Sequence, residues 1–278
     1  MKRRRIAAGN WWVGLGLLLF SFWTMAPVVW LILSSLMRQD ALTATPPDFS
    51  LAAFTVDNYL QVLNSAVALG RGFANSLIVA FSTTLVALAL GAPAAYALAR
   101  LRLPGSGPIL LLVLATQMFP GIVIAIPLFI VMSRLGLIDS RTGLIITYLS
   151  FNLPIVIWIL RGFFLAIPPS LEKAAAVDGA TVFQVFRLIV LPISLPPLFA
   201  TAVFSFIEAW NEFFFALILT RQNAQTVPLV ISQFAGQYQT VFGQMMAAST
   251  MAVAPVVILA VIFRKYLMQG FTEGMTKG

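Results

Sequence analysis

Cysteine and histidine are both absent from the 278 residues of this chain. Their absence excludes thiolate and imidazole metal sites, a cysteine nucleophile and any Ser-His-Asp triad. The chain also contains no G-x-x-x-x-G-K-[ST] pattern, the loop that holds nucleotide phosphates. These types of site are therefore not expected in this chain. If ATP drives it, another subunit must bind the nucleotide.

Charged residues are also scarce. They make up 9% of the chain, against roughly 25% in soluble domains. Hydrophobic residues make up 60%, and the mean hydropathy is +0.96, which is typical of an integral membrane protein. The formal net charge of +8 could also indicate nucleic-acid binding. The Lys and Arg residues, however, flank apolar runs and form no continuous stripe, so we expect a lipid environment and no nucleic-acid partner.

The apolar residues fall into six long runs. A hydrocarbon core of about 30 Å requires about 20 apolar residues per helix, so each run is long enough to cross a membrane. The first run, Trp11 to Met37, is much longer than the core of a cleavable signal peptide and is therefore expected to be retained. The sequence predicts a single all-α transmembrane domain over residues 1–278. Its spans are expected near residues 12–37, 75–99, 109–132, 143–166, 190–219 and 246–269.

The distribution of basic residues predicts the orientation of these spans, because cytoplasmic loops carry an excess of Lys and Arg. With the N-terminus inside, 12 of the 17 basic residues lie on the cytoplasmic side. Both termini are therefore expected to face the cytoplasm.

The predicted cytoplasmic loop at about residues 168–188 contains unusually clear helix signals. Ser170 is a suitable N-cap for a helix over Leu171 to Val177, and Gly179 can adopt the left-handed conformation that ends a helix. Thr181 and Gln184 then have the spacing of a capping box. The loop should contain a short helix, a tight turn and a second helix that leads into the membrane.

A helix of about eight residues is too short to be stable alone in water, so it must pack against something. Two interpretations follow from the residues themselves. The helix either rests on lipid or on its own bundle, or fits into a cleft of a partner and transmits force.

The same loop resembles the EAA loop of permease subunits of bacterial ABC importers. Ala174-Ala175, Asp178-Gly179-Ala180 and the segment Ile189 to Pro192 match its three elements at the family spacing. One departure is that Lys173 occupies the family's glutamate position, with Glu172 one residue earlier. Over nearly the whole chain the sequence is most similar to the second permease of maltose-type carbohydrate importers.

This resemblance implies a type I ABC importer permease in the bacterial plasma membrane. Its implied partners are a second permease subunit, two ATPase subunits that bind ATP and Mg, and an extracytoplasmic sugar-binding protein. The implied cargo is a disaccharide or an oligosaccharide. The chain itself is implied to be a transport subunit with no enzyme activity and no cofactor of its own. The residues implied to couple to the ATPase are Glu172, Lys173, Ala174, Ala175, Asp178, Gly179 and Ala180.

Two further segments take their roles from the resemblance. The glutamine-rich loop from Arg221 to Gln244 corresponds to a loop that reaches into the binding protein, and the tail from Phe271 to Gly278 corresponds to one that inserts between the ATPases. The loop residues implied to touch the binding protein are Gln233-Phe234, Gln237, Tyr238 and Gln239.

Polar residues inside the predicted spans are candidates for lining the translocation path, because ionisable and polar groups are rare in lipid. Glu208 and Glu212 lie four residues apart and share one helix face. They could form a proton relay, a polar lining or a structural network. The path candidates are Asn75, Gln117, Asn152, Glu208 and Asn211.

Two alternatives to a sugar importer remain at this point. One is an ABC permease for another small solute, such as a polyol, a glycerol phosphate or an amino acid. The other is a proton-coupled secondary transporter, which would need no ATPase.

Overall fold

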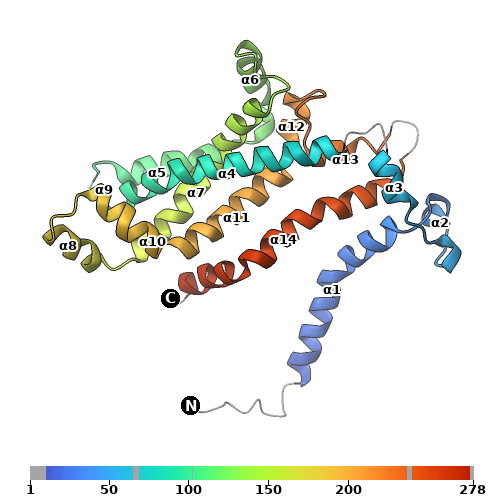
Figure 1. The fold of residues 1–278 in the computed structure, drawn as a ribbon, viewed down its shortest axis with the longest axis horizontal. Helices are drawn as coiled ribbons and strands as arrows, with labels where there is room; N and C mark the ends of the chain where they lie inside the picture. The colour runs from blue at the N-terminus through green and yellow to red at the C-terminus, as the bar shows by residue number, and fades with distance from the viewer. Residues whose placement is uncertain (1–10, 65–68, 102, 237–239, 276–278) are drawn as a thin grey trace. The chain divides into compact units, whose positions relative to one another are not determined.

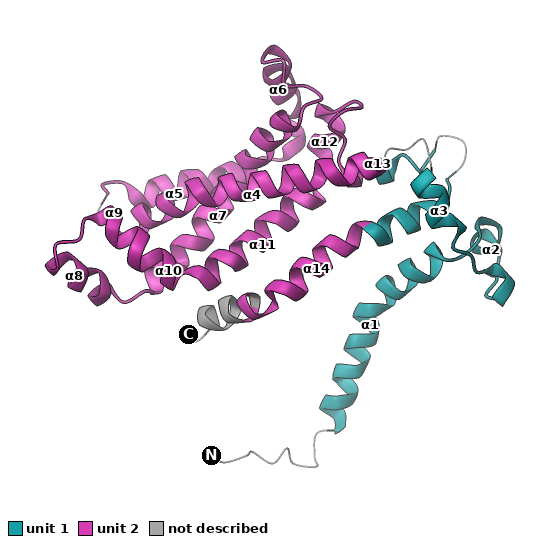
Figure 2. Cartoon of the chain, in the orientation of Figure 1, with its two compact units in different colours: residues 1–67, 231–251 teal, residues 68–230, 252–278 magenta. Residues whose placement is uncertain are grey.

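The computed structural model describes residues 11–64, 69–101, 103–236 and 240–275, with the backbone alone for Leu267 and residues 269–275. Within these residues the fold is all-α, and its only β features are two isolated bridges. The chain divides into two compact units, residues 1–67 with 231–251 and residues 68–230 with 252–278 (Figure 2).

The first unit contains α1 (Trp11–Ser35), α2 (Gln39–Thr43), the 3-10 turn η1 (Leu51–Ala53), α3 (Asp57–Asn64) and the first turns of α14 (Phe242–Met275). Asn58 ties these elements together, since its side-chain amide donates to the carbonyls of Ser35 and Met37 at 2.9 and 2.8 Å. Gly243 lies directly against that amide, where a Cβ would come within 2.7 Å of Asn58. Most of α1 is exposed on all sides and strongly apolar, as expected of a helix surrounded by lipid.

The second unit is built around three helices that pack against one another, α4 (Leu69–Arg100), α7 (Arg141–Ala166) and α11 (Leu195–Asn211) (Figure 1). Small residues allow the helices to approach closely, as is common in membranes. A Cβ on Gly91 of α4, for example, would lie 2.7 Å from Val156 Cγ1 of α7. The other elements of this unit are α5 (Ser106–Ala115), η2 (Thr116–Met118), α6 (Gly121–Arg134), α8 (Pro169–Val177), α9 (Val182–Val185), the π-helical turn η3 (Phe186–Val190), α10 (Leu191–Ile193), α12 (Phe214–Leu219), most of α13 (Val227–Ser232) and the later turns of α14.

Four helices in the described residues are long and apolar enough to cross a membrane, and the number rises to six if each of two bent pairs counts as one span. The bent pairs are Ser106–Met118 with Gly121–Arg134, at 94°, and Val182–Ile193 with Leu195–Asn211, at 78°.

Proline chemistry explains the first bend. Phe119 precedes Pro120 and is extended, with ψ 123°, because the proline ring disfavours helical backbone at the preceding residue. At the second bend Ser194 leaves the helical region, and two prolines follow in the first turn of α11, where a missing N–H costs little. The predicted spans 109–132 and 190–219 are thus interrupted helices, a feature that the hydropathy pattern did not predict.

Candidate functional site

The loop between α7 and η3 folds as a short helix, a turn and a second short helix. The helix α8 begins at Pro169, with Pro168 as an N-cap that makes no side-chain capping bond. The prediction of Ser170 as the N-cap is therefore wrong. Pro169 pre-sets a helical φ, and this starts the helix before the serine.

The end of α8 has the glycine-closed geometry that the sequence predicted. Gly179 has φ +84°, and the N–H groups of Gly179 and Ala180 donate to the carbonyls of Ala176 and Ala175 at 3.1 and 3.0 Å. This is a Schellman motif, in which left-handed glycine closes a helix. The predicted capping box is confirmed: Thr181 Oγ1 accepts from Gln184 N–H, and Gln184 Oε1 accepts from Thr181 N–H.

These two short helices present an apolar outer surface. Val177 is 87% exposed and Phe183 67% exposed, with Leu171 and Val182 also exposed. Ala175, by contrast, is buried in the core of the second unit. The segment is therefore anchored by one side while its other side is free to contact a partner.

Glu172 faces inward and contacts the end of α4. We call the group formed by Glu172, Ile167 and the α4 residues Tyr96 and Arg100 the Glu172 corner. Arg100 Nε lies 2.7 Å from Glu172 Oε1, and Tyr96 Oη donates to Glu172 Oε2 at 2.9 Å. Arg100 also donates to the carbonyl of Ile167. The corner joins α8 to the end of α4.

The other residues implied to couple to the ATPase differ from Glu172 in their exposure. Lys173, Ala174, Asp178 and Gly179 are exposed, and Ala180 is half-buried. Lys173, which occupies the family's glutamate position, therefore points to the surface, whereas the neighbouring Glu172 is held inside.

A second carboxylate, that of Asp139, binds the loop at residues 221–224, near the other end of α4. Asp139 accepts from the backbone N–H groups of Arg221, Gln222, Asn223 and Ala224 at 3.0 to 3.2 Å. We call this the Asp139 corner. Partial burial on its own would raise the pKa of Asp139, but these N–H groups favour the charged form and lower it from 3.8 to about 2.

Asn75 strengthens the same corner. Its amide nitrogen donates to the carbonyls of Asn223 and Gln225 at 2.9 and 2.8 Å, and its oxygen accepts from Arg141 Nε at 2.7 Å. All its hydrogen-bonding groups thus contact protein.

Three other path candidates meet in one small cavity. Gln117, Asn152 and Glu208 line a space of about 140 Å³ between η2, α7 and α11. Asn211 is exposed and does not line it. The complete lining is Gln117, Tyr148, Phe151, Asn152, Ile155, Glu208, Ala209, Glu212 and Phe215.

The two glutamates of the cavity have different surroundings. Glu212 accepts from the N–H groups of Phe215 and Ala216 at 2.8 and 3.2 Å, so it caps the start of α12. Glu208 makes no hydrogen bond or ion pair with another described residue. Of the two, Glu208 is the one whose carboxylate is free to bind a solute.

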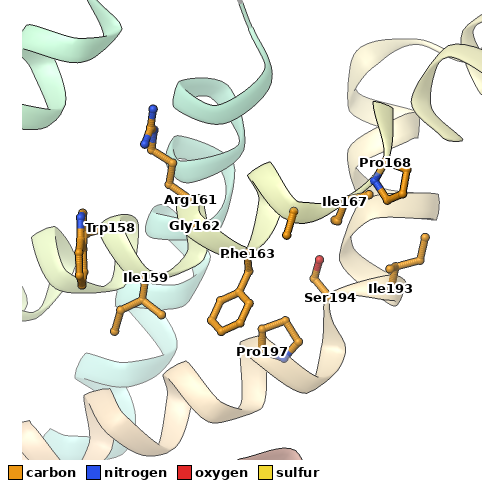
Figure 3. A pocket seen from close by; sticks show the side chains of 11 residues that line it. Trp158, Ile159, Arg161, Gly162, Phe163, Ile167, Pro168, Ile193, Ser194 and Pro197 are labelled. Carbon is orange, nitrogen blue, oxygen red and sulfur yellow. The ribbon is translucent and has the colours of Figure 1, made fainter. Parts of the chain in front are cut away.

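A larger cavity of about 660 Å³ lies where α7 ends and the chain bends at Ser194 (Figure 3). Phe163, Ser194 and Pro197 lie close together at its wall, and the lining is mostly apolar. It therefore offers few hydrogen-bond partners to a polar solute.

Gln237, Tyr238 and Gln239 lie outside the described residues, as do the last three residues of the tail. In the loop from Arg221 to Gln244, Gln233 is exposed, whereas Phe234 is buried.

The residues that the sequence did not predict are the partners Tyr96, Arg100 and Asp139. Arg100 could have been noticed as a cation at a helix end, but nothing local indicates its partner.

The family model of the binding-protein-dependent transport system inner membrane component matches residues 87–273, which include Glu172 and the whole cavity around Glu208. The chain belongs to this family. It is thus a multi-pass membrane permease subunit of an ABC transporter, a transport component rather than an enzyme. No group of three or more metal-ligating side chains occurs in the part of the chain that the structure describes.

Relatives match this permease over nearly its full length. It is 37% identical to the trehalose transport system permease protein SugB of Mycobacterium tuberculosis, over 97% of this chain and 98% of the relative. It is 35% identical to the trehalose/maltose transport system permease protein MalG of Thermococcus litoralis, over 95% of each chain. The diacetylchitobiose uptake system permease protein NgcG of Streptomyces coelicolor is 32% identical over 93% of this chain and 86% of the relative.

A solved structure supports the fold. A chain of a bacterial ABC transporter involved in the import of the acidic polysaccharide alginate superposes with a TM-score of 0.74, covering 96% of this chain and 99% of that one. Sequence identity is 23%, so this likeness shows the fold alone.

Proposed function

We propose that this permease forms half of the translocation pathway of an ATP-driven sugar importer, with a disaccharide or short oligosaccharide as cargo. Relatives named for trehalose, maltose and diacetylchitobiose transport support a sugar. The observation that carries the mechanism is α8, a short helix capped at its end, anchored by Ala175 and Glu172, and apolar on its exposed side.

The proposed partners follow from this arrangement. The exposed side of α8 and α9, with Lys173, Ala174, Asp178 and Gly179, would fit a cleft in an ATPase subunit that binds ATP and Mg. A second permease would complete the pathway. A solved alginate transporter is in complex with a periplasmic protein, which supports a binding protein as a partner. In our proposal this protein contacts the loop Arg221 to Gln244.

The proposed orientation places both termini and the Glu172 corner in the cytoplasm, and the Asp139 corner outside. The excess of Lys and Arg on the first side supports it. The tail from Phe271 to Gly278 then lies on the ATPase side.

The proposed path follows the polar side chains of the cavity, Gln117, Asn152 and Glu208. Asn211, which is exposed beside them, would face the path at the junction with the second permease. Asn75 would contribute by fixing the outer loop, since its polar groups are already bonded to protein.

The test is to break α8 at its end. Gly179→Pro removes the left-handed residue and its hydrogen bond to Ala176, so the helix loses the shape that a cleft would recognise. We expect the amount of sugar imported per ATP hydrolysed to fall at least about tenfold in proteoliposomes that contain the complete transporter.

The chain provides a matched control. Gly136 ends α6 in the same Schellman motif, with φ +67° and N–H bonds from Gly136 to Ser133 and from Leu137 to Met132. Gly136→Pro should cause similar backbone damage and leave the coupling ratio unchanged. Equal coupling ratios in the two variants would contradict the proposal.

A further inference from the structure

The cavity beside Glu208 combines the chemical groups that a sugar requires, and this inference rests on the proposed function. Carboxylates accept hydrogen bonds, and carboxamides both donate and accept them. Asn152 and Gln117 supply carboxamides, and Glu208 supplies a carboxylate. Such convergence of a few polar groups within an apolar wall is typical of ligand sites.

Asn152 is the most informative of these residues. It is only 6% exposed, yet its carboxamide makes no hydrogen bond to another described residue. Buried polar groups normally have partners, because leaving one unpaired is unfavourable. Since Asn152 lines the cavity, a solute or water there would provide the missing partner.

The aromatic side of the cavity fits the apolar face of a sugar ring. Phe151 and Phe215 both line it and stack on each other, with ring centroids 4.8 Å apart. The space of about 140 Å³ corresponds to about five waters at roughly 30 Å³ each, a size that suits one sugar unit better than a whole oligosaccharide.

The charge of the lining selects among sugars. Glu208 and Glu212 are both acidic, and no Lys or Arg is among the lining residues. Like charges repel each other, and no basic lining residue offsets the two carboxylates. A sugar that carries a carboxylate, sulfonate or phosphate is therefore disfavoured, whereas neutral sugars are accepted.

We propose that the cavity lined by Gln117, Asn152 and Glu208 is a subsite for one neutral sugar unit, and that Glu208 excludes acidic sugars. Glu208 and Asn152 would bind hydroxyl groups. Glu212 would hold α12 in position through its bonds to Phe215 and Ala216.

The first experiment measures trehalose uptake by the complete transporter. Asn152→Leu and Glu208→Gln should each lower uptake about tenfold or more. Ser150→Leu is the matched control, because Ser150 lies on the same helix, is exposed and does not line the cavity. Wild-type uptake in both cavity variants would overturn the subsite.

The second experiment measures how the charge of the cavity affects reaction rates at an introduced cysteine, with no sugar present. It is possible because the chain contains no cysteine of its own. In Gln117→Cys, a cationic methanethiosulfonate reagent should react roughly tenfold faster than an anionic one. Adding Glu208→Gln should remove most of this preference. Equal rates for both reagents, or a preference that survives Glu208→Gln, would overturn the role of Glu208.

The proposed function and the proposed subsite are contradicted by different results. If the unmodified complex imports none of trehalose, maltose and diacetylchitobiose, the proposed function is contradicted. The reagent preference at Gln117→Cys still tests the cavity separately, because it depends on neither ATP nor cargo.

Discussion

The Glu172 corner and the Asp139 corner both join segments that are distant in sequence, but their carboxylates bind different groups. In each, one carboxylate connects segments that are more than 70 residues apart in sequence. Asp139 binds four backbone N–H groups, whose positions are set by the fold of the loop. Glu172 binds the side chains of Arg100 and Tyr96, which can change rotamer while the helices stay intact.

The difference indicates which corner is built to move. Fixed hydrogen bonds to backbone suit a rigid edge of the bundle, whereas a side-chain ion pair can break and re-form as α8 shifts. The side chains of Arg100 and Glu172 are only 12% and 16% exposed, so the pair is largely removed from water. Removing either partner alone should therefore be much more harmful than removing both.

The largest expected effect comes from reversing one charge at the Glu172 corner. Arg100→Glu or Glu172→Arg alone places two like charges together, and we expect a loss of about 3–5 kcal/mol in stability. Thermal unfolding of the purified complex and sugar uptake would measure it.

The double variant Arg100→Glu with Glu172→Arg is the control for this prediction. It restores opposite charges and should recover part of the stability and of the uptake. If the double variant is as damaged as the sum of the single ones, the two residues do not interact.

A smaller effect is expected at the Asp139 corner. Asp139→Ala leaves four N–H groups without their acceptor, which should destabilise the loop at residues 220–226 by about 1–3 kcal/mol. Hydrogen exchange of those amides should speed up. Exchange around Gly179 should not change, and an increase there would argue against two separate corners.

Acid should weaken the Asp139 corner in a defined range. The pKa of Asp139 is depressed from 3.8 to about 2 in the folded chain, so its stabilising effect is complete above about pH 4 and is lost as the pH falls towards 2. Hydrogen exchange of residues 221–224, corrected for the intrinsic pH dependence, should show this loss. Asp139→Asn should abolish the pH dependence, and its persistence there would assign it to another group.

The smallest effect is expected from Tyr96→Phe. It removes one hydrogen bond to Glu172 and keeps the ring that packs on Phe164 and Phe186, so about 1 kcal/mol should be lost. Thermal unfolding would detect it. A loss as large as that of Arg100→Glu would mean that Tyr96, and not Arg100, holds Glu172.

Local signals in the sequence predicted local structure well. Gly179 and the Thr181–Gln184 pair encode their own geometry within a few residues, so the turn and the capping box are as expected. The start of α8 was misplaced because Pro169 and Ser170 are both good first residues, and their competition depends on how the chain leaves α7. The family and the sugar-permease resemblance were also confirmed.

Long-range partners were not predictable from one sequence. The partners Arg100 and Glu172 are separated by 72 residues, and Asp139 and Arg221 by 82. Only the folded packing of α4, α7 and α11 brings them together. For the same reason Gln117, Asn152 and Glu208 were each recognised as polar residues in spans, while the cavity that unites them was not.

The helix α4 carries one corner at each end, with Asn75 near its start and Arg100 at its last residue. Its 32 residues correspond to a rod of about 48 Å. If such a rod pivots where Gly91 packs against Val156, a tilt of about 5° displaces its start by about 3 Å and its Arg100 end by about 1 Å. A displacement of one end of α4 would then move its other end on the opposite face of the membrane directly, without rearrangement of the residues between them.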